Sequence, residues 1–211
     1  GTLSAATGSK FANGAISGAI QGAMAKAPHE AVRGRVPRYA QDVEVDPRVA
    51  ALAMAEGEEA MKEIRLRRYD DLDRLAVDVA DALQPIQNKW HTEVGVRIFN
   101  NGGFFEAGSV TSEGQICVRG NTCGVNLAKS INLNGSNRNL VGSFHTHPWN
   151  DTFSKSDLAS AWAARNWSGR EHTTYVTMPD RSVLSFDTGL VGKIPGVSDW
   201  PGYLNHTKRV R

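Results

Sequence analysis

Apolar residues recur at helical spacing from residue 47 to about residue 67. Asp46-Pro47 provides an N-cap followed by a first-turn proline, so a helix is predicted to begin there and to run to about Arg67. Gly57 is expected to weaken its middle. The residues expected on its buried face are Val49, Leu52, Ala53, Ala60, Met61 and Ile64.

A second helical pattern follows Asp70-Asp71 and is cleaner than the first. Its apolar stripe consists of Leu72, Leu75, Ala76, Val79, Leu83 and Ile86. Pro85 and the Asn88-Lys89 pair are predicted to end this helix.

From residue 93 the pattern changes to the alternation of polar and apolar residues that is typical of strands. Strands are predicted over 93–99, 104–111, 115–119 and 140–147, with a last hairpin that pairs 173–178 with 182–186. A further helix is predicted to begin after Ser154. This order of elements predicts an α/β fold with a mixed β-sheet flanked by helices and a helical, Gly-rich N-terminal extension.

The two ends of the chain differ in composition from its middle. Residues 1–46 are rich in glycine and alanine, and Gly14, Gly18 and Gly22 would form one smooth stripe on a helix, so this part is predicted to be a pliable linker or a docking segment. Residues 47–71 are predicted to form an accessory helix, 72–190 the main domain, and 191–211 a basic C-terminal strap.

Charge excludes some classes of partner. The 24 Lys and Arg residues nearly balance the 22 Asp and Glu residues and leave a net charge of +2, which predicts neither a nucleic-acid nor a membrane partner. No apolar run is long enough to span a bilayer, so no membrane span is expected.

The stretch from Leu140 to Asp157 carries the candidate chemistry. His145 and His147 are two residues apart on a predicted strand, so their side chains point to the same side. Two imidazoles placed in this way can converge on one metal ion. Ser154 is predicted to cap the next helix and to hold the Asp157 carboxylate beside the strand end. Two histidines and a carboxylate with an open fourth position form a catalytic zinc pattern, although Ser-x-x-Asp is also common as plain helix capping.

Cys117 and Cys123 flank a short turn segment, and a hairpin there would place them opposite each other. A disulfide and two separate buried thiols both remain open at this point, and zinc binding by this pair is favoured less than either, because the histidine site already accounts for a metal. Two cysteines in a chain of 211 residues do not make a disulfide scaffold.

His145-Thr146-His147-Pro148 followed by Ser154-x-x-Asp157 resembles the signature of the JAMM (JAB/MPN) zinc metallopeptidases. The resemblance covers about residues 72 to 188, and the segment between His147 and Ser154 is about one residue shorter than in most members. It implies a fold in which the histidine strand and the aspartate helix hold zinc. It also implies cleavage of peptide or isopeptide bonds, notably those of ubiquitin-like proteins.

The resemblance also implies a catalytic glutamate upstream of the histidines. Glu93 is the candidate general base, because it begins the strand after the 72–86 helix, and Glu106 is its rival. The Ser154 hydroxyl is the candidate to stabilise the carbonyl oxygen under attack. His172 could support the site from behind the ligands, but it is expected to lie on the surface. His91 could also approach the site, and neither histidine is assigned a role.

The stretch from Gly8 to Ala15 resembles the segment that precedes the variable C-terminal domain of Rhs-type polymorphic toxins. This resemblance implies a secreted toxin domain that is delivered into a target cell. The implied partners are a protein or peptide substrate, a cognate immunity protein, and the parent toxin shell or secretion apparatus. Two alternatives stay open: a catalytically inactive JAB-like binding module, and an amidase acting on a non-protein amide such as a cell-wall crosslink.

Overall fold

A computed structural model describes residues 44–118, 123–149, 151–190 and 205–211. These residues all belong to the unit Ala40–Arg211. The Gly14-Gly18-Gly22 stripe lies outside the described residues.

A seven-stranded sheet in the order β2-β1-β4-β5-β6-β7, with β3 also paired to β1, forms the middle of this unit. The strands are β1 Val94–Asn101, β2 Phe104–Ala107, β3 Thr111–Ser112, β4 Leu140–Thr146, β5 Thr173–Thr177, β6 Val183–Asp187 and β7 Thr207–Arg209. β4 and β5 run parallel, whereas the other pairs are antiparallel. The predicted α/β fold with a mixed sheet is therefore confirmed.

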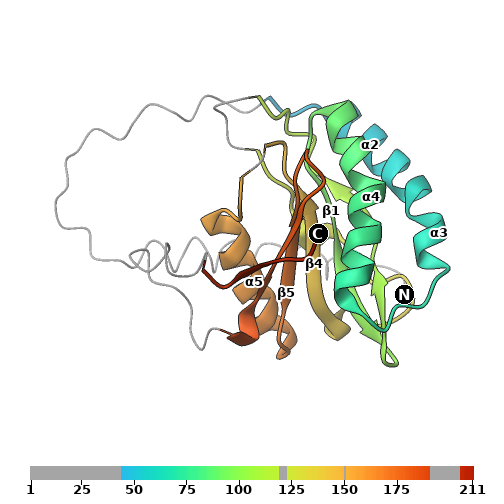
Figure 1. Ribbon diagram of the computed structural model, residues 1–211. Helices are drawn as coiled ribbons and strands as arrows, with labels where there is room; N and C mark the ends of the chain where they lie inside the picture. Colours follow the sequence, from blue (N-terminus) through green and yellow to red (C-terminus); the bar gives the residue numbers. More distant parts are fainter. Residues whose placement is uncertain (1–43, 119–122, 150, 191–204) are drawn as a thin grey trace, which may run out of the picture. The chain divides into compact units, whose positions relative to one another are not determined.

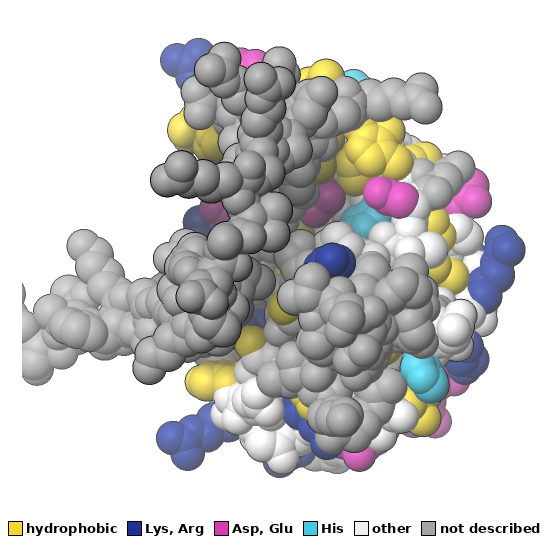
Figure 2. All heavy atoms as spheres, turned by 90° about the vertical axis from the view of Figure 1, so that its left-hand side faces the viewer, with side chains coloured by type: hydrophobic (Ala, Val, Ile, Leu, Met, Phe, Trp, Pro, Cys, Tyr) yellow, Lys and Arg dark blue, Asp and Glu magenta, His cyan; other side chains and the backbone are white. Residues whose placement is uncertain are grey.

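Helices cover both faces of the sheet (Figure 1). They are α2 Pro47–Ala60, α3 Lys62–Arg65, α4 Leu72–Trp90 and α5 Lys155–Ser168, together with the 3₁₀ turns η1 Leu127–Lys129, η2 Asn137–Asn139 and η3 Thr188–Leu190. The helices α2, α3 and α4 lie on one face and α5 on the other. Figure 2 views the molecule from the α5 side, where histidine and acidic side chains adjoin each other. None of the described helices combines the length and hydropathy that a membrane span needs.

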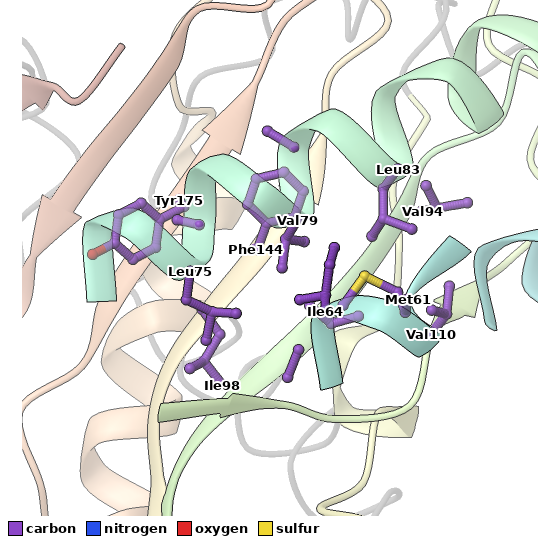
Figure 3. Close-up of a cluster of buried hydrophobic side chains, with 14 of the residues drawn as sticks. Met61, Ile64, Leu75, Val79, Leu83, Val94, Ile98, Val110, Phe144 and Tyr175 are labelled. Atoms are coloured by element: carbon purple, nitrogen blue, oxygen red, sulfur yellow. The ribbon is translucent and has the colours of Figure 1, made fainter. Parts of the chain in front are cut away.

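The larger core fills the space between α4 and the sheet (Figure 3). Val94, Val96 and Ile98 enter it from β1, and Phe144 enters it from β4. Its fully buried members include Leu75, Val79, Leu83, Val96, Ile98 and Phe144. A smaller core on the α5 face joins Phe153, Leu158, Trp162, Val176 and Phe186. Both layers are therefore closed by apolar contacts, which drive folding in proportion to the area removed from water.

The predicted helices differ from the observed ones in several details. The predicted 47–67 helix is divided at Met61 into α2 and α3. α4 continues through Pro85 to Trp90, because Ile86 and Gln87 beyond the proline are buried and stabilise the last turn. In the first helix the expected burial of Leu52 and Ala60 is wrong, since Leu52 is 47% exposed and Ala60 is exposed too.

The buried face of α2 instead consists of small residues, Ala50, Ala53 and Gly57. A Cβ atom on Gly57 would lie 2.7 Å from a methyl carbon of Val110. Small side chains therefore let this helix pack closely, and the glycine serves that approach.

The segment from Gln115 to Val118 does not form the predicted strand. Gln115 makes only an isolated bridge with Val45. β1 already pairs with β2 and β3 on one side and with β4 on the other, so no strand edge is left for this segment.

The C-terminal residues add β7 to the edge of the sheet beside β6. Lys208 pairs with Asp73 at 2.7 Å, and Arg211 pairs with Asp81 at 2.8 Å. Both acidic partners lie on α4, so these residues contact the helix as well as the sheet.

Candidate metal centre

The two histidines lie at the C-terminal end of β4, and both side chains are buried. Thr146, between them, points to the opposite side, where its hydroxyl group accepts from the Val94 amide at 3.1 Å. The His147 amide donates to the Thr177 carbonyl on β5 at 2.7 Å. Neighbours on both sides therefore fix the strand end and the direction of the two imidazoles.

The third member of the group comes from the start of α5. Ser154 is the N-cap, and its hydroxyl accepts from the Asp157 amide while the Asp157 carboxylate accepts from the Ser154 amide. This reciprocal capping box fixes the carboxylate at the first turn. The predicted helix start is confirmed, and it places Asp157 against the end of β4.

The ligand atoms of the three residues converge. His145 Nε2 lies 3.0 Å from His147 Nε2, and the Asp157 oxygens lie 3.3 Å from His145 Nε2 and 3.4 Å from His147 Nε2. Zinc holds nitrogen and oxygen at about 2.0–2.1 Å in a tetrahedron, whose ligands are then about 3.3–3.4 Å apart. The spacing of the three ligand atoms therefore suits a small metal ion in tetrahedral coordination.

The charges around His145, His147 and Asp157 favour a positive charge between these three side chains. Burial opposes the charged form of His147, but hydrogen bonds to Asp151 and Asp157 outweigh it and raise its pKa to about 10. Burial likewise opposes ionisation of Asp157, yet the two histidines hold the pKa of this carboxyl well below its usual range. Where a proton is held this strongly between acceptor atoms, a divalent cation can take its place.

Asp151 is a site residue that the sequence reasoning missed. Its carboxylate lies 3.1 Å from Nδ1 of His147, the ring nitrogen that points away from the other ligands. Carboxylates in this position orient the imidazole and fix its tautomer in metal sites. An acidic residue four positions after a candidate histidine ligand is the signal that could have found it.

Glu93 lies at the junction between α4 and β1 and is 6% exposed. Burial raises the pKa of its carboxyl to about 8, with His147 lowering it and Asp157 and Asp151 raising it further. Gly95, two residues after Glu93, lies opposite His145 in the sheet, so Glu93 lies at the end of β1 that adjoins the histidines. A buried carboxyl group with a raised pKa is typical of a general acid or base.

The rival glutamate lies elsewhere. Glu106 pairs with Phe99, four residues along β1 from Gly95, which is opposite His145. Its carboxylate accepts from Asn101 at 2.8 Å and from Asn134 at 2.9 Å. Glu106 therefore belongs to a polar network at the other end of the strand.

His172 is buried, which corrects the expectation that it lies on the surface. Its Nε2 lies 2.9 Å from the Ser143 hydroxyl group on β4. Burial, helped by the charge of Arg97, lowers the pKa of His172 to about 3, so the ring is neutral. This contact was not foreseen because Ser143 lies 29 positions away in the chain.

The two cysteines form a disulfide bond, which answers the question that the sequence left open. Cys123 Sγ lies 3.5 Å from Oε1 of Glu93. Glu93, Cys117 and Cys123 form a second group of potential ligands, but sulfurs that are joined to each other are not thiolates. In the oxidised chain this group is therefore not a metal site.

Comparison with known protein families, with characterised proteins and with solved structures finds no match for this chain. Its function is therefore inferred from its own residues.

Proposed function

We propose that this chain is a zinc-dependent hydrolase that cleaves a peptide or isopeptide bond. The observation that carries the proposal is the convergence of His145, His147 and Asp157, whose nitrogen and oxygen atoms lie 3.0 to 3.4 Å apart. The resemblance of their motif to the JAMM metallopeptidases supports the same function, and a buried glutamate close by supports catalysis over a purely structural metal.

Zinc is the proposed metal because of the donor set. Imidazole nitrogens with one carboxylate suit zinc, and the ligand spacing fits its small tetrahedron. When bound, zinc would supply a Lewis acid and lower the pKa of water towards neutrality. The Asp157 side chain is 17% exposed, so the group is reached from solvent on the α5 side.

Glu93 is the proposed proton carrier. As a buried carboxylate it would take a proton from the attacking water and later give it to the leaving amine. Burial raises the pKa of this carboxyl group, which favours holding the proton between these two steps. Asp151 would keep the His147 ring in one tautomer by accepting its Nδ1 proton at 3.1 Å.

The Ser154 hydroxyl is proposed to stabilise the carbonyl oxygen of the substrate. Its oxygen accepts the Asp157 amide at 3.3 Å and lies 2.7 Å from the Ser156 hydroxyl. Because the oxygen accepts the capping bond, its own proton is left to donate. A substrate carbonyl would accept this proton in place of the contact with Ser156, without breaking the helix cap.

We also propose, from the resemblance of the 8–15 segment, that the domain acts as the C-terminal toxin domain of a secreted Rhs-type polymorphic toxin. In that setting a cognate immunity protein would protect the producing cell. The parent shell or the secretion apparatus would deliver the domain into a target cell.

A substrate panel tests the proposed reaction. Oxidised, zinc-loaded protein is incubated with ubiquitin-like conjugates, an unfolded polypeptide and peptidoglycan fragments, and new amino groups are measured. The proposal expects cleavage of a protein substrate and none by the His145→Ala/His147→Ala variant. Cleavage of peptidoglycan fragments alone would make the chain an amidase. Bound zinc with no cleavage of any substrate would make it a binding module.

A further inference from the structure

The disulfide bond lies against the proposed proton carrier. Cys123 Sγ is 3.5 Å from Glu93 Oε1, and the Cys117 amide donates to the His91 carbonyl at 2.6 Å, two residues before Glu93. The carboxylate oxygen and the two sulfurs all lie within 4.8 Å of one another. Both cysteines are thus held next to the same buried carboxyl group.

We propose that reduction of the Cys117–Cys123 disulfide creates a second zinc site from Glu93, Cys117 and Cys123, and that zinc bound there takes Glu93 out of catalysis. The proposed zinc binding is supported by the positions of these three residues alone. The loss of catalysis rests on the proposed function, because it requires Glu93 to carry the proton.

We call this change between the disulfide and the zinc-bound form the redox switch, and its reduction step conserves electrons and protons. A cellular dithiol gives two electrons and two protons to the disulfide and itself becomes a disulfide, which leaves two cysteine thiols in the chain. Each thiol then loses its proton to solvent as it binds zinc, and the Glu93 carboxylate completes a set of three negatively charged ligands.

The distances suit this ligand set. Zinc holds sulfur at about 2.3 Å and carboxylate oxygen at about 2.0–2.2 Å, so neighbouring sulfur and oxygen ligands are about 3.6 Å apart. The observed separation between Cys123 Sγ and Glu93 Oε1 is 3.5 Å. The Cα atoms of the two cysteines are 5.4 Å apart, so small side-chain rotations separate the sulfurs without moving the backbone far.

The switch has a direction. Thiols stay reduced in the cytosol and pair in oxidising compartments. Zinc at the second site would therefore hold the enzyme inactive in the cytosol of the cell that makes it. In an oxidising compartment a disulfide-bonded oxidant would accept the two electrons, so that the Cys117–Cys123 bond forms, zinc is released and Glu93 is freed. Redox control of this kind predicts activity in an oxidising compartment of the target and not in its cytosol.

The test counts zinc in a variant that lacks the first site. Two samples of the His145→Ala/His147→Ala protein are loaded with zinc, one oxidised and one reduced with a phosphine. A phosphine is used because it adds no thiol that would compete for the metal. We expect no bound zinc in the oxidised variant and about one per chain after reduction. With cobalt in place of zinc, reduction should add a thiolate-to-metal charge-transfer band.

Matched controls identify the ligands. Adding Cys117→Ser to the same variant should abolish the zinc gained on reduction, while circular dichroism reports that the fold is kept. In otherwise unchanged protein, reduction with excess zinc should lower cleavage at least tenfold, and the Cys117→Ser/Cys123→Ser variant should not respond.

A reduced His145→Ala/His147→Ala variant that takes up no metal would overturn the second site. The same result would leave the first site and the proposed hydrolase untouched. Conversely, if the oxidised, unchanged protein binds no zinc, the proposed function is wrong. Zinc uptake by the reduced His145→Ala/His147→Ala variant would still test the second site.

Discussion

The direction of the two imidazoles is set by the residues around them. Thr146 bonds the backbone of β1 from the opposite side of β4, and Asp151 holds the outer nitrogen of His147. The histidine spacing on a strand made their common side predictable from sequence. Asp151 was missed, although its place four residues after His147 is a usable signal, because its contact with the ring depends on tertiary structure and not on a local pattern.

Glu93→Gln is the sharpest test of the proposed base. The amide keeps the shape of the carboxyl group but cannot take a proton, so zinc should stay bound while cleavage falls roughly 10²-fold or more. Elemental analysis and the cleavage assay measure the two effects separately. Glu106→Gln is the matched control and should change neither. Equal cleavage by Glu93→Gln and by the unchanged protein would remove Glu93 from the mechanism.

The metal-free protein should lose stability as the pH rises. Hydrogen bonds to Asp151 and Asp157 outweigh burial and raise the pKa of His147 from 6.5 to about 10, so its stabilising effect is complete below 6.5 and is lost towards 10. Burial raises the pKa of Glu93 from 4.5 to about 8. Between these two pH values this shift also lowers the stability of the folded protein as the pH rises.

Thermal unfolding of the chelator-treated, oxidised protein measures this effect. The midpoint should be higher at about pH 5.5 than at about pH 9. In His147→Gln the slope should be smaller, because the raised imidazole pKa is absent. A midpoint that rises over this range would contradict the charge arrangement of the site.

At the scale of elements, local patterns predicted the parts that position the site. The Ser154-x-x-Asp157 box marked the start of α5, and alternation marked β4, because both depend on neighbouring residues. The end of α4 was missed because the burial of residues beyond Pro85 outweighs the local preference of proline. The disulfide bond was left open since it depends on how β1, β3 and the 115–118 segment come together.

β7 offers a test at this scale. Deleting residues 205–211 removes the strand beside β6 and the ion pairs of Lys208 and Arg211 with α4. We expect a lower unfolding midpoint, in which the exposed ion pairs account for no more than about 1 kcal/mol each. Zinc binding should be unchanged, because His145, His147 and Asp157 lie on β4 and α5. Loss of zinc from a folded truncated protein would show that β7 supports the site.

At the scale of the molecule, the larger core and the candidate metal group lie on opposite faces of the sheet. The face covered by α4 carries the larger core, while the α5 face carries the metal group together with a smaller core. The period of apolar residues predicted both layers. It could not show which end of β1 approaches the histidines, and that detail distinguishes Glu93 from Glu106.

Residues 1–43 should be dispensable for folding. The described residues that begin the folded unit already bond to it, since the Ile116 amide donates to the Glu44 carbonyl and the Asp46 amide to the Gly114 carbonyl, both at 2.9 Å. Protein beginning at Glu44 should unfold cooperatively and bind zinc. Deletion to residue 46 is the matched comparison and should be less stable by about 1 kcal/mol, because it removes the N-cap of α2. Aggregation of the Glu44 protein would contradict this expectation.

X-ray absorption at the zinc edge tests the central claim most directly, because it reports the atoms around the metal. The oxidised protein, loaded with one equivalent of zinc, should show only nitrogen and oxygen neighbours at about 2.0–2.1 Å, with the outer-shell scattering of two imidazoles. The His145→Ala/His147→Ala variant, treated in the same way, should retain no zinc. A sulfur neighbour at about 2.3 Å, or an oxidised protein that binds no zinc, would contradict the account.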